Sequence, residues 1–342
     1  MSNRVYTEEE LAAALKTLGV TDQTEVSRYG SGHINDTFKV ETAGGRRYIL
    51  QRVTDAFDKE VLKTNILRVT SHLKAKGVKT LDVLGYENPW RLYGFLEGYT
   101  SVDVITDPAQ AELAAAAFAS FQNALADLPE PQLLPVIPRF HDTVDRLRLL
   151  DEAAAADVKG RKALVAEELA FVDARRTEAA KIVTMMAKGE IPVRTTHNDT
   201  KINNVMLASD GTNVVIDLDT TMPGSALYDF GDMVRTSSAA AEDEKDLSKV
   251  YSKKEYFEAL VKGYTAGAKF LTDAEKANLA FSGRLITLTI GIRFLTDFLA
   301  GDTYFHTAYD DHNLVRCRTQ FKMVKSMEDQ AEEYEAIVRK YV

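Results

Sequence analysis

The spacing of apolar positions changes after about the first hundred residues of the chain. Leu11, Leu15 and Leu18 recur at helical spacing within residues 6–19, which predicts a helix that ends at a glycine. Residues 25–53 favour two or three strands, with a tight turn at 43–45. Residues 55–77 predict a second helix, and residues 80–98 predict two more strands around a turn that contains Pro89.

Helical spacing dominates the rest of the chain. Residues 107–131 predict a helix that ends at prolines, and residues 162–189 predict another. At least three more helices are expected, at about 253–270, 272–300 and 315–341. Strands followed by helices indicate an α+β fold. We therefore predict a small β-rich N-terminal lobe over residues 1–97 and a larger, mostly helical lobe over residues 98–342.

Composition narrows the possible partners. The formal net charge is -9 and the pI is near 5.3, which argues against a broad nucleic-acid surface but leaves room for a local positive pocket. Cys317 is the single cysteine, so no intrachain disulfide can form. The sequence shows neither a signal-like N-terminal segment nor a run of about 20 apolar residues. We expect a soluble, cytoplasmic protein that contacts neither membrane nor nucleic acid.

The stretch "THNDTKINNVMLASDGTNVVIDLD" at 196–219 carries the strongest chemical signal. Asp210-Gly211 between two apolar runs predicts a hairpin with a two-residue turn. In that register Asn204 faces Asp217, with Cβ atoms about 5 Å apart. One amide oxygen and one carboxylate would then converge on a site suited to Mg²⁺.

Further polar residues surround this predicted metal site. Asp199 lies just before the hairpin and is the candidate base that accepts a proton from a hydroxyl. His197 is expected to hold the loop by hydrogen bonding, and Lys201 to supply positive charge to a transferring phosphoryl group. Asp219 shares a strand face with Asp217, so it is expected either to bind a second metal ion or to fix the loop.

These residues resemble the aminoglycoside phosphotransferase and choline kinase superfamily. "HNDTKINN" fits that group's H-x-D-x-x-x-x-N loop through His197, Asp199 and Asn204, and "VVIDLD" is similar to its metal-binding segment through Asp217. The order also matches protein kinases. The resemblance implies a bilobal, protein-kinase-like fold that uses ATP and Mg²⁺. A literal "DFG" begins at Asp229 but lies too far along the chain to be the metal motif. Asp229 is interpreted as a structural carboxylate or one that borders the acceptor site.

The resemblance assigns a nucleotide-clamping role to the N-terminal lobe. "YGSGHINDTFKV" at 29–40 is expected to cover the triphosphate, with its tip at Ser31, Gly32 and His33. Kinases of this type carry a phosphate-binding lysine on the third strand. Here the corresponding segment offers only Gln51 or Arg52, and alternation allows only one of them to face the cleft.

Three other residues complete the predicted nucleotide site. Glu60 on the following helix is the expected partner for the group at position 51 or 52, unless it is an ordinary surface charge. Phe95 and Glu97 belong to "YGFLEG" at 93–98, the expected hinge whose backbone groups meet adenine.

A closer resemblance is to bacterial N-acetylhexosamine 1-kinases, and it extends over nearly the whole chain. It rests on "GSGHINDTF", "YILQRV", "THNDTKINNV", "VIDLDT-x-MPG", "DFGD-x-x-R" and "RFLTDFL-x-GD-x-YF". It implies ATP- and Mg²⁺-dependent phosphorylation of the anomeric C1 hydroxyl of N-acetylglucosamine or N-acetylgalactosamine, by a protein expected to be a monomer. The residues expected to bind this small neutral amino sugar are His33, Asp36, Asp199, Asp229, Arg293, Asp297 and Tyr304.

Alternatives remain open at this point. Arg293 and Asp297, four residues apart on one helix, either form an ordinary ion pair or hold a sugar or phosphate oxygen. Choline-type kinases need an aromatic cage, and Trp90, the single tryptophan, belongs to the small lobe. Aminoglycoside kinases need acidic walls, which the mixed-charge segment 239–247 does not clearly provide. A metal-dependent phosphohydrolase and a non-catalytic pseudokinase are the remaining alternatives.

Overall fold

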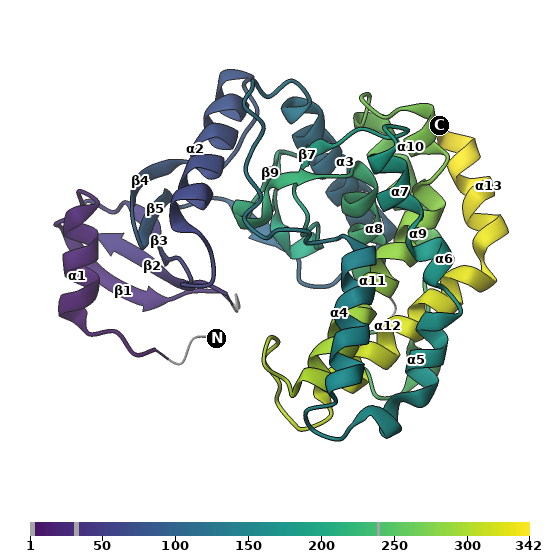
Figure 1. Ribbon diagram of the computed structural model, residues 1–342. Helices are drawn as coiled ribbons and strands as arrows, with labels where there is room; N and C mark the ends of the chain where they lie inside the picture. The colour runs from purple at the N-terminus through teal and green to yellow at the C-terminus, as the bar shows by residue number, and fades with distance from the viewer. Residues whose placement is uncertain (1–3, 31–33, 238–239) are drawn as a thin grey trace.

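The computed structural model describes residues 4–30, 34–237 and 240–342. An antiparallel five-stranded sheet with the order β1-β2-β3-β5-β4 forms the N-terminal part, at one end of the molecule (Figure 1). Its strands are β1 (Gln23–Arg28), β2 (Asp36–Thr42), β3 (Arg47–Arg52), β4 (Val83–Glu87) and β5 (Trp90–Gly94).

The two faces of this sheet pack against different helices, because alternate side chains point in opposite directions. Leu50 and Leu92 lie in one buried cluster with Leu15 of α1 (Glu8–Thr17), a helix that begins at a Thr7–Glu10 capping box. Tyr93, on the opposite face, lies in a second cluster with α2 (Lys59–Ala75) and the C-terminal part. The sheet therefore has an outer face under α1 and an inner face toward the rest of the molecule.

Helices build the larger C-terminal part. The central helix is α11 (Leu279–Ala300), which packs against α4 (Thr143–Ala156), α8 (Ala226–Thr236) and α12 (His312–Asp329). The other helices are α3 (Pro108–Leu125), α5 (Ala166–Asp173), α6 (Arg176–Ala179), α7 (Lys181–Ala187), α9 (Lys254–Gly267), α10 (Asp273–Lys276) and α13 (Ala331–Tyr341), with short 3₁₀ turns η1 (Lys162–Val165), η2 (Ile202–Asn204), η3 (Leu218–Thr220) and η4 (Leu247–Lys249).

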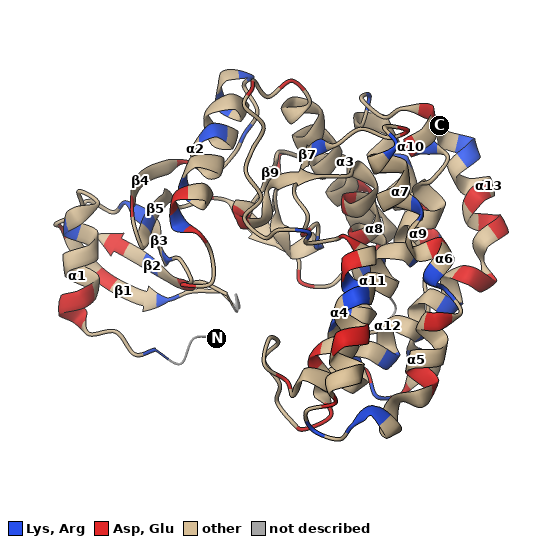
Figure 2. Cartoon of the chain, viewed as in Figure 1, with Lys and Arg blue, Asp and Glu red and all other residues tan. Residues whose placement is uncertain are grey.

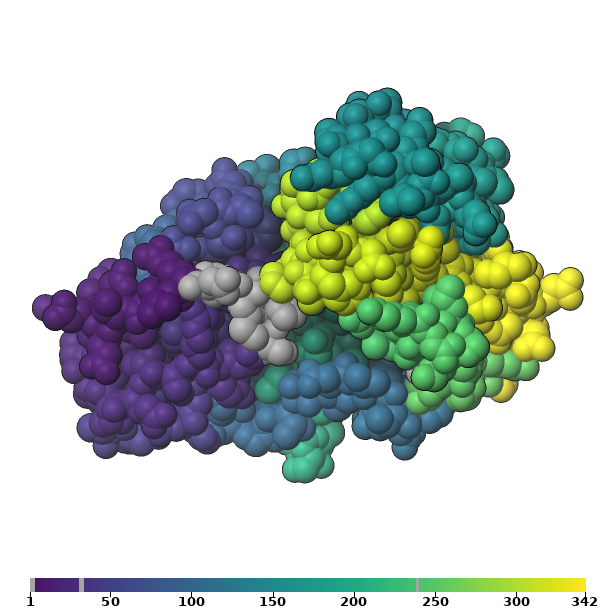
Figure 3. Space-filling view, turned by 90° about the horizontal axis from the view of Figure 1, so that it is seen from below, coloured from purple at the N-terminus to yellow at the C-terminus, as the bar shows by residue number. Residues whose placement is uncertain are grey.

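Two small sheets lie between the five-stranded sheet and the helices. One has the order β6-β8-β9, formed by β6 (Tyr99–Ser101), β8 (Val205–Ala208) and β9 (Asn213–Val215), and the other pairs β7 (Arg194–Thr196) with β10 (Met222–Gly224). In the space-filling view the purple N-terminal residues occupy one end, and teal and yellow segments of the helical part occupy the other (Figure 3).

The helix expected over residues 162–189 is not continuous, which corrects the prediction. The segment divides into η1, α5, α6 and α7. Arg175 lies at the break, where it donates to the carbonyl oxygen of Phe171 at 2.8 Å and pairs with Glu328 of α12 at 2.7 Å. Tertiary pairing therefore overrides the helical propensity of the segment.

Helix α11 is long and apolar enough to cross a membrane by length and composition, although Arg284, Arg293 and Asp297 interrupt its apolar sequence. Of its most apolar window, 78% is buried inside the protein. Charged residues instead cover the outer helices, where Lys and Arg alternate with Asp and Glu (Figure 2). Helix α11 is thus a core helix, against which α4, α8 and α12 pack.

Candidate active site

The hairpin that carries the metal-site residues differs by one residue from the predicted register. Val205 faces Val215, and the N–H of Ile216 donates to the carbonyl oxygen of Asn204 at 2.9 Å. The turn has three residues and ends at Gly211 with φ +82°, which is the geometry of a turn followed by a bulge. The predicted cross-strand pairing of Asn204 with Asp217 is therefore wrong.

Asp217 reaches the site by a different route. It follows β9 in the left-handed conformation, with φ 56°, which costs an L-residue roughly 1 kcal/mol. Its side chain is exposed, although the surrounding protein desolvates the carboxylate. Desolvation and then the charges of Asp219 and Asp199 raise the pKa of Asp217 to about 7. A strained residue thus places a carboxylate where negative charge accumulates.

Asp199, Lys201 and Asn204 come together in the catalytic loop, residues 196–204. The Asn204 amide nitrogen donates to the backbone oxygen of Asp199 at 2.8 Å and to its Oδ2 at 3.1 Å. Lys201 Nζ lies 3.1 Å from the same Oδ2, and Asp199 raises the lysine's pKa although desolvation opposes the charge. The Asp199 carboxylate is 25% exposed, so it is both held by the loop and accessible to a substrate.

The residues present fit a hard divalent cation. Because Asn204 uses its amide nitrogen for Asp199, its Oδ1 is left for a cation, and Asp217 supplies a nearby carboxylate with a raised pKa. No cluster of three or more His, Cys, Asp or Glu side chains able to hold a metal is found in the described part of the chain. Mg²⁺ does not require one, since it commonly uses one or two protein oxygens together with substrate phosphates.

His197 and Asp229 hold the catalytic loop from behind. Asp229 is 0% exposed and accepts from the N–H groups of His197 at 2.8 Å and Asn198 at 2.7 Å, and from the Gln122 side chain. The His197 ring bonds the Ile216 carbonyl oxygen at 2.9 Å and the Asp199 N–H at 3.3 Å. Burial raises the pKa of Asp229 to about 6 despite these donors.

This environment corrects one of the predicted substrate contacts. Asp229 is fully buried and its oxygens face the loop backbone, so it cannot touch an acceptor. Of the two interpretations of "DFG", the structural carboxylate is the one that the geometry supports.

Asn198 is a site residue that the sequence did not reveal. It has φ 65° directly before Asp199, and its amide nitrogen donates to the Thr220 carbonyl oxygen at 2.9 Å. The Thr196 hydroxyl donates to its Oδ1 at 3.1 Å. A Cβ at Gly224 would lie 2.3 Å from the Thr196 hydroxyl and 2.7 Å from Asn198 Oδ1. Glycine at 224 thus leaves the space that this strained turn needs.

His141 anchors the same turn from α4's side of the site. Its Nε2 lies 2.9 Å from the Asn198 carbonyl oxygen, and burial lowers its pKa to about 4. The ring is therefore neutral near pH 7, and since a carbonyl can only accept, Nε2 carries the proton. The loop that bears Asp199 is fixed on both sides.

Asp219 takes the second of its two expected roles, whereas Asp36 is not placed as predicted. Both carboxylate oxygens of Asp219 bind Arg91, at 2.6 and 3.0 Å, and Asn35 also donates to it at 2.6 Å, so it fixes the segment and is not open to a metal ion. Asp36 lies on the outer face of the sheet, 5% exposed. It accepts from the Tyr6 hydroxyl at 2.6 Å and from Arg28 at 3.1 Å, so it cannot reach a sugar.

The strand pairing shows which of Gln51 and Arg52 lies on the inner face of the five-stranded sheet. Gln51 lies on the inner face, opposite Arg91, whereas Arg52 lies on the outer face and pairs with Asp55 at 3.1 Å. Glu60 is exposed and accepts from the Asn88 side chain at 2.6 Å instead of pairing with either residue, so the structure supports the ordinary surface charge of its two interpretations.

The expected hinge and hairpin tip are described only in part. The Phe95 ring lies 5.8 Å from that of Tyr29 and under the Arg47 guanidinium, which also pairs with Glu97. Ser31, Gly32 and His33, the predicted tip, lie outside the described residues.

The predicted acceptor residues form two separate groups of contacts. Asp297 does not orient Arg293, because it accepts the N–H groups of Thr303, Tyr304 and Phe305 at 2.8 to 2.9 Å. It is 4% exposed and therefore holds a loop instead of touching a sugar, which corrects its assignment.

Arg293 is surrounded by aromatic rings. Its guanidinium carbon lies 4.8 Å from the Phe140 ring centre and 5.6 Å from that of Tyr304, whose hydroxyl is 3.4 Å from Nη2. Within residues 4–30, 34–237 and 240–342 it makes no ion pair with a carboxylate. Burial and the charges of Arg146 and Arg235 lower its pKa. We call Phe140, Arg293, Tyr304 and Phe305 the acceptor region.

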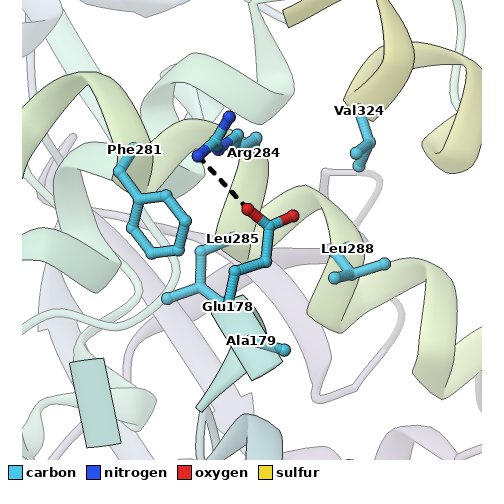
Figure 4. A pocket seen from close by; sticks show the side chains of 7 residues that line it. All are labelled: Glu178, Ala179, Phe281, Arg284, Leu285, Leu288 and Val324. Atoms are coloured by element: carbon cyan, nitrogen blue, oxygen red, sulfur yellow. Dashed lines mark ion pairs between the residues drawn. The ribbon is translucent and has the colours of Figure 1, made fainter. Parts of the chain in front are cut away.

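A small void lies within the helical part. It lies among α6, α11 and α12, where Arg284 pairs with Glu178 at 3.2 Å (Figure 4). It has no room for a water molecule, and none of its lining residues belongs to the catalytic loop. It is a packing feature of the helical part.

Comparisons with known proteins agree with this geometry. A model of the "Phosphotransferase enzyme family" matches residues 25–269. The fold is similar to an ethanolamine kinase from Plasmodium vivax, with TM-score 0.64 and 16% identity over 93% of this chain and 91% of that one.

Two further solved structures show the same fold. An aminoglycoside phosphotransferase from Alicyclobacillus acidocaldarius has TM-score 0.61 and 12% identity over 99% and 97% of the two chains. A spectinomycin phosphotransferase, solved with ADP and spectinomycin, has TM-score 0.59 and 14% identity over 96% and 100%. The predicted α+β, protein-kinase-like fold with a β-rich N-terminal part and a larger helical part is confirmed.

Proposed function

Because the chain belongs to the phosphotransferase enzyme family, we propose that it transfers the γ-phosphoryl group of ATP to the anomeric C1 hydroxyl of N-acetylglucosamine or N-acetylgalactosamine. The class of reaction, phosphoryl transfer to an alcohol group of a small molecule, follows from the family. The choice of amino sugar is our proposal, and it is supported by the sequence segments that resemble those of N-acetylhexosamine 1-kinases and by the acceptor region.

The charge around Arg293 is the observation that favours a neutral acceptor over a cationic one. A binding site for choline, ethanolamine or an aminoglycoside has to attract a cation, which requires acidic side chains or an aromatic cage. Here the half-buried guanidinium of Arg293 has aromatic neighbours and lies near Arg146, and near Arg235, which is paired with Asp232 and Glu242. Such a surface repels an ammonium group but offers N–H donors and flat rings to the hydroxyl and acetamido oxygens of a neutral sugar.

The catalytic loop supplies the proton transfer. Asp199 accepts a hydrogen bond from the C1 hydroxyl and takes its proton, while the sugar oxygen forms a bond to the γ-phosphorus and the bond to the ADP oxygen breaks. Asn204 and Lys201 keep the carboxylate in place through Oδ2. Lys201 also contributes positive charge beside the transferring phosphoryl group.

A bound divalent cation would contribute charge neutralisation. Asn204 Oδ1 and Asp217 would hold Mg²⁺, which neutralises negative charge on the phosphates when it is bound. The anchoring of Asn198 by His141 and Asp229 keeps Asp199 and Asn204 in register with each other. Rigid placement of both groups is what the loop contributes.

The test is a panel of acceptors with labelled ATP, with the position of the new phosphate determined by NMR. We expect a sugar 1-phosphate from N-acetylglucosamine or N-acetylgalactosamine, and little product from choline, ethanolamine or kanamycin. Phosphate on C6, or preferred turnover of a cationic acceptor, would refute the proposal. Phosphate release without sugar indicates a hydrolase, and no turnover at all indicates a pseudokinase.

An Asp199→Asn variant separates chemistry from binding. Loss of a general base costs about 10² to 10⁴ in rate, whereas ATP binding is expected to remain within a few-fold of the wild type. Wild-type turnover in this variant would remove Asp199 as the base.

A further inference from the structure

A cluster of polar residues joins the inner face of the small sheet to the metal segment. Arg91 on β5 is 1% exposed, and its two terminal nitrogens donate to the two oxygens of Asp219 at 2.6 and 3.0 Å. Asp219 lies two residues after Asp217, in η3. Asn35, at the end of the glycine-rich segment, donates to the same carboxylate at 2.6 Å. Fork-to-fork pairing of this kind fixes orientation as well as distance.

Gln51 belongs to this cluster and has both ends of its amide occupied. Its Oε1 accepts from Arg91 Nε at 3.0 Å, and its Nε2 donates to the Thr37 hydroxyl at 3.0 Å. Thr37, Gln51 and Arg91 face one another across β2, β3 and β5. The residue at the expected lysine position therefore holds an arginine of the neighbouring strand.

We propose that Arg91 is a positioning residue that replaces the missing third-strand lysine by acting on Asp219 instead of on the nucleotide. It fixes the metal segment so that Asp217 faces the cleft, and it keeps Asp219 from competing for the cation. Gln51 orients Arg91, and Asn35 connects the same carboxylate to the glycine-rich segment. The inference deepens the proposed phosphoryl transfer and rests on it for its catalytic consequence.

Three observations support this assignment over direct phosphate binding. Arg91 is buried, its three nitrogens are directed at protein acceptors, and one of those acceptors is a full negative charge. Asp217 is exposed although it is two residues away from buried Asp219. Arg91 therefore neutralises the buried Asp219 carboxylate and leaves the Asp217 carboxylate exposed.

The test is a double-mutant cycle of Arg91→Met and Asp219→Asn. If Arg91 acts only through Asp219, the double variant loses no more activity than the more damaged single variant, and we expect each to lose about 10²-fold in kcat. The double variant contains no uncompensated buried charge, so it is the variant expected to stay folded. Additive losses would overturn the proposal.

A second readout does not depend on turnover. Mn²⁺ binding to nucleotide-free protein, followed by EPR, is expected to weaken at least tenfold in the double variant, while metal-free ATP binding stays within about threefold. Unchanged Mn²⁺ binding, or a tenfold loss of metal-free ATP binding, would overturn the proposal. If the wild type phosphorylates a different alcohol, the proposed acceptor fails but the Mn²⁺ measurement still tests Arg91.

Arg175→Met is the matched control. Arg175 also makes a two-pronged, largely buried pair, with Glu328 at 2.7 and 2.8 Å, but it lies between α5 and α6. Its loss is expected to lower stability without changing Mn²⁺ affinity or kcat of the folded protein. An equal loss of Mn²⁺ affinity in this control would assign the effect of Arg91 to general destabilisation and would overturn the proposal.

Discussion

Substitution of Gly224 by alanine tests the packing behind the catalytic loop. The added methyl group would lie 2.3 Å from the Thr196 hydroxyl and 2.7 Å from Asn198 Oδ1, and real contacts of this kind are never that short. Thr196 and Asn198 are buried, so neither can move into solvent. Overpacking costs about 1–3 kcal/mol, and loss of the Thr196–Asn198 hydrogen bond adds about 1 kcal/mol. We expect a destabilisation of about 2–4 kcal/mol.

The functional consequence follows from the position of Asn198. It directly precedes Asp199, so a shift of its backbone moves the candidate base, and misplacement by about 1 Å costs about 10²-fold in rate. Urea unfolding followed by circular dichroism gives the stability, and steady-state kinetics give kcat.

Gly44→Ala is the control for this experiment. The nearest atom to a Cβ at Gly44 is the Thr42 hydroxyl oxygen at 4.0 Å, so the change is expected to stay within about 0.5 kcal/mol of the wild type. Wild-type stability and kcat in the Gly224→Ala variant would refute the packing argument.

Three other outcomes are expected. Arg293→Met raises the acceptor KM at least tenfold and leaves the KM for ATP unchanged, because the guanidinium lies in the acceptor region; an equal rise in both would contradict this. Asp229→Asn lowers kcat about 10²-fold, because an amide cannot accept from both loop N–H groups; unchanged kcat would exclude this role. Asp217 has a folded-state pKa of about 7, above its ordinary 3.8, so ionisation disfavours the folded state. In EDTA, stability relative to Asp217→Asn is expected to fall from pH 4 to pH 7, and Mn²⁺ is expected to reverse the loss; parallel urea midpoints for the two proteins would refute it.

Sequence reasoning predicted the features that depend on local pattern. Apolar periodicity gave α1, α2 and the strands of the small sheet, because each of these elements has one buried face. The order of polar residues in the catalytic loop predicted that Asp199, Lys201 and Asn204 come together. These three are close in sequence, so a single turn is sufficient to join them.

The remaining features depend on contacts between distant segments. Nothing in the neighbourhood of Arg91 indicates that its partner is Asp219, since the two are far apart in sequence. Likewise the spacing of Arg293 and Asp297 suggested an ion pair, whereas the Asp297 carboxylate accepts hydrogen bonds from the backbone N–H groups of the following loop. The hairpin register was missed because Asp-Gly accommodates turns of two or three residues, and the choice between them depends on the pairing beyond the turn.

The loop held by Asp297 has a consequence for redesign. Three successive backbone N–H groups, at residues 303–305, converge on a carboxylate of the core helix α11, so the path of the loop at position 304 is held without the Tyr304 side chain. Tyr304 is 66% exposed, and it is anchored through its backbone N–H and not through its ring. A library that varies the side chain at 304 and keeps Asp297 would therefore present new surfaces to incoming alcohols on an unchanged scaffold. Natural relatives would be able to diversify in the same place at little cost to folding.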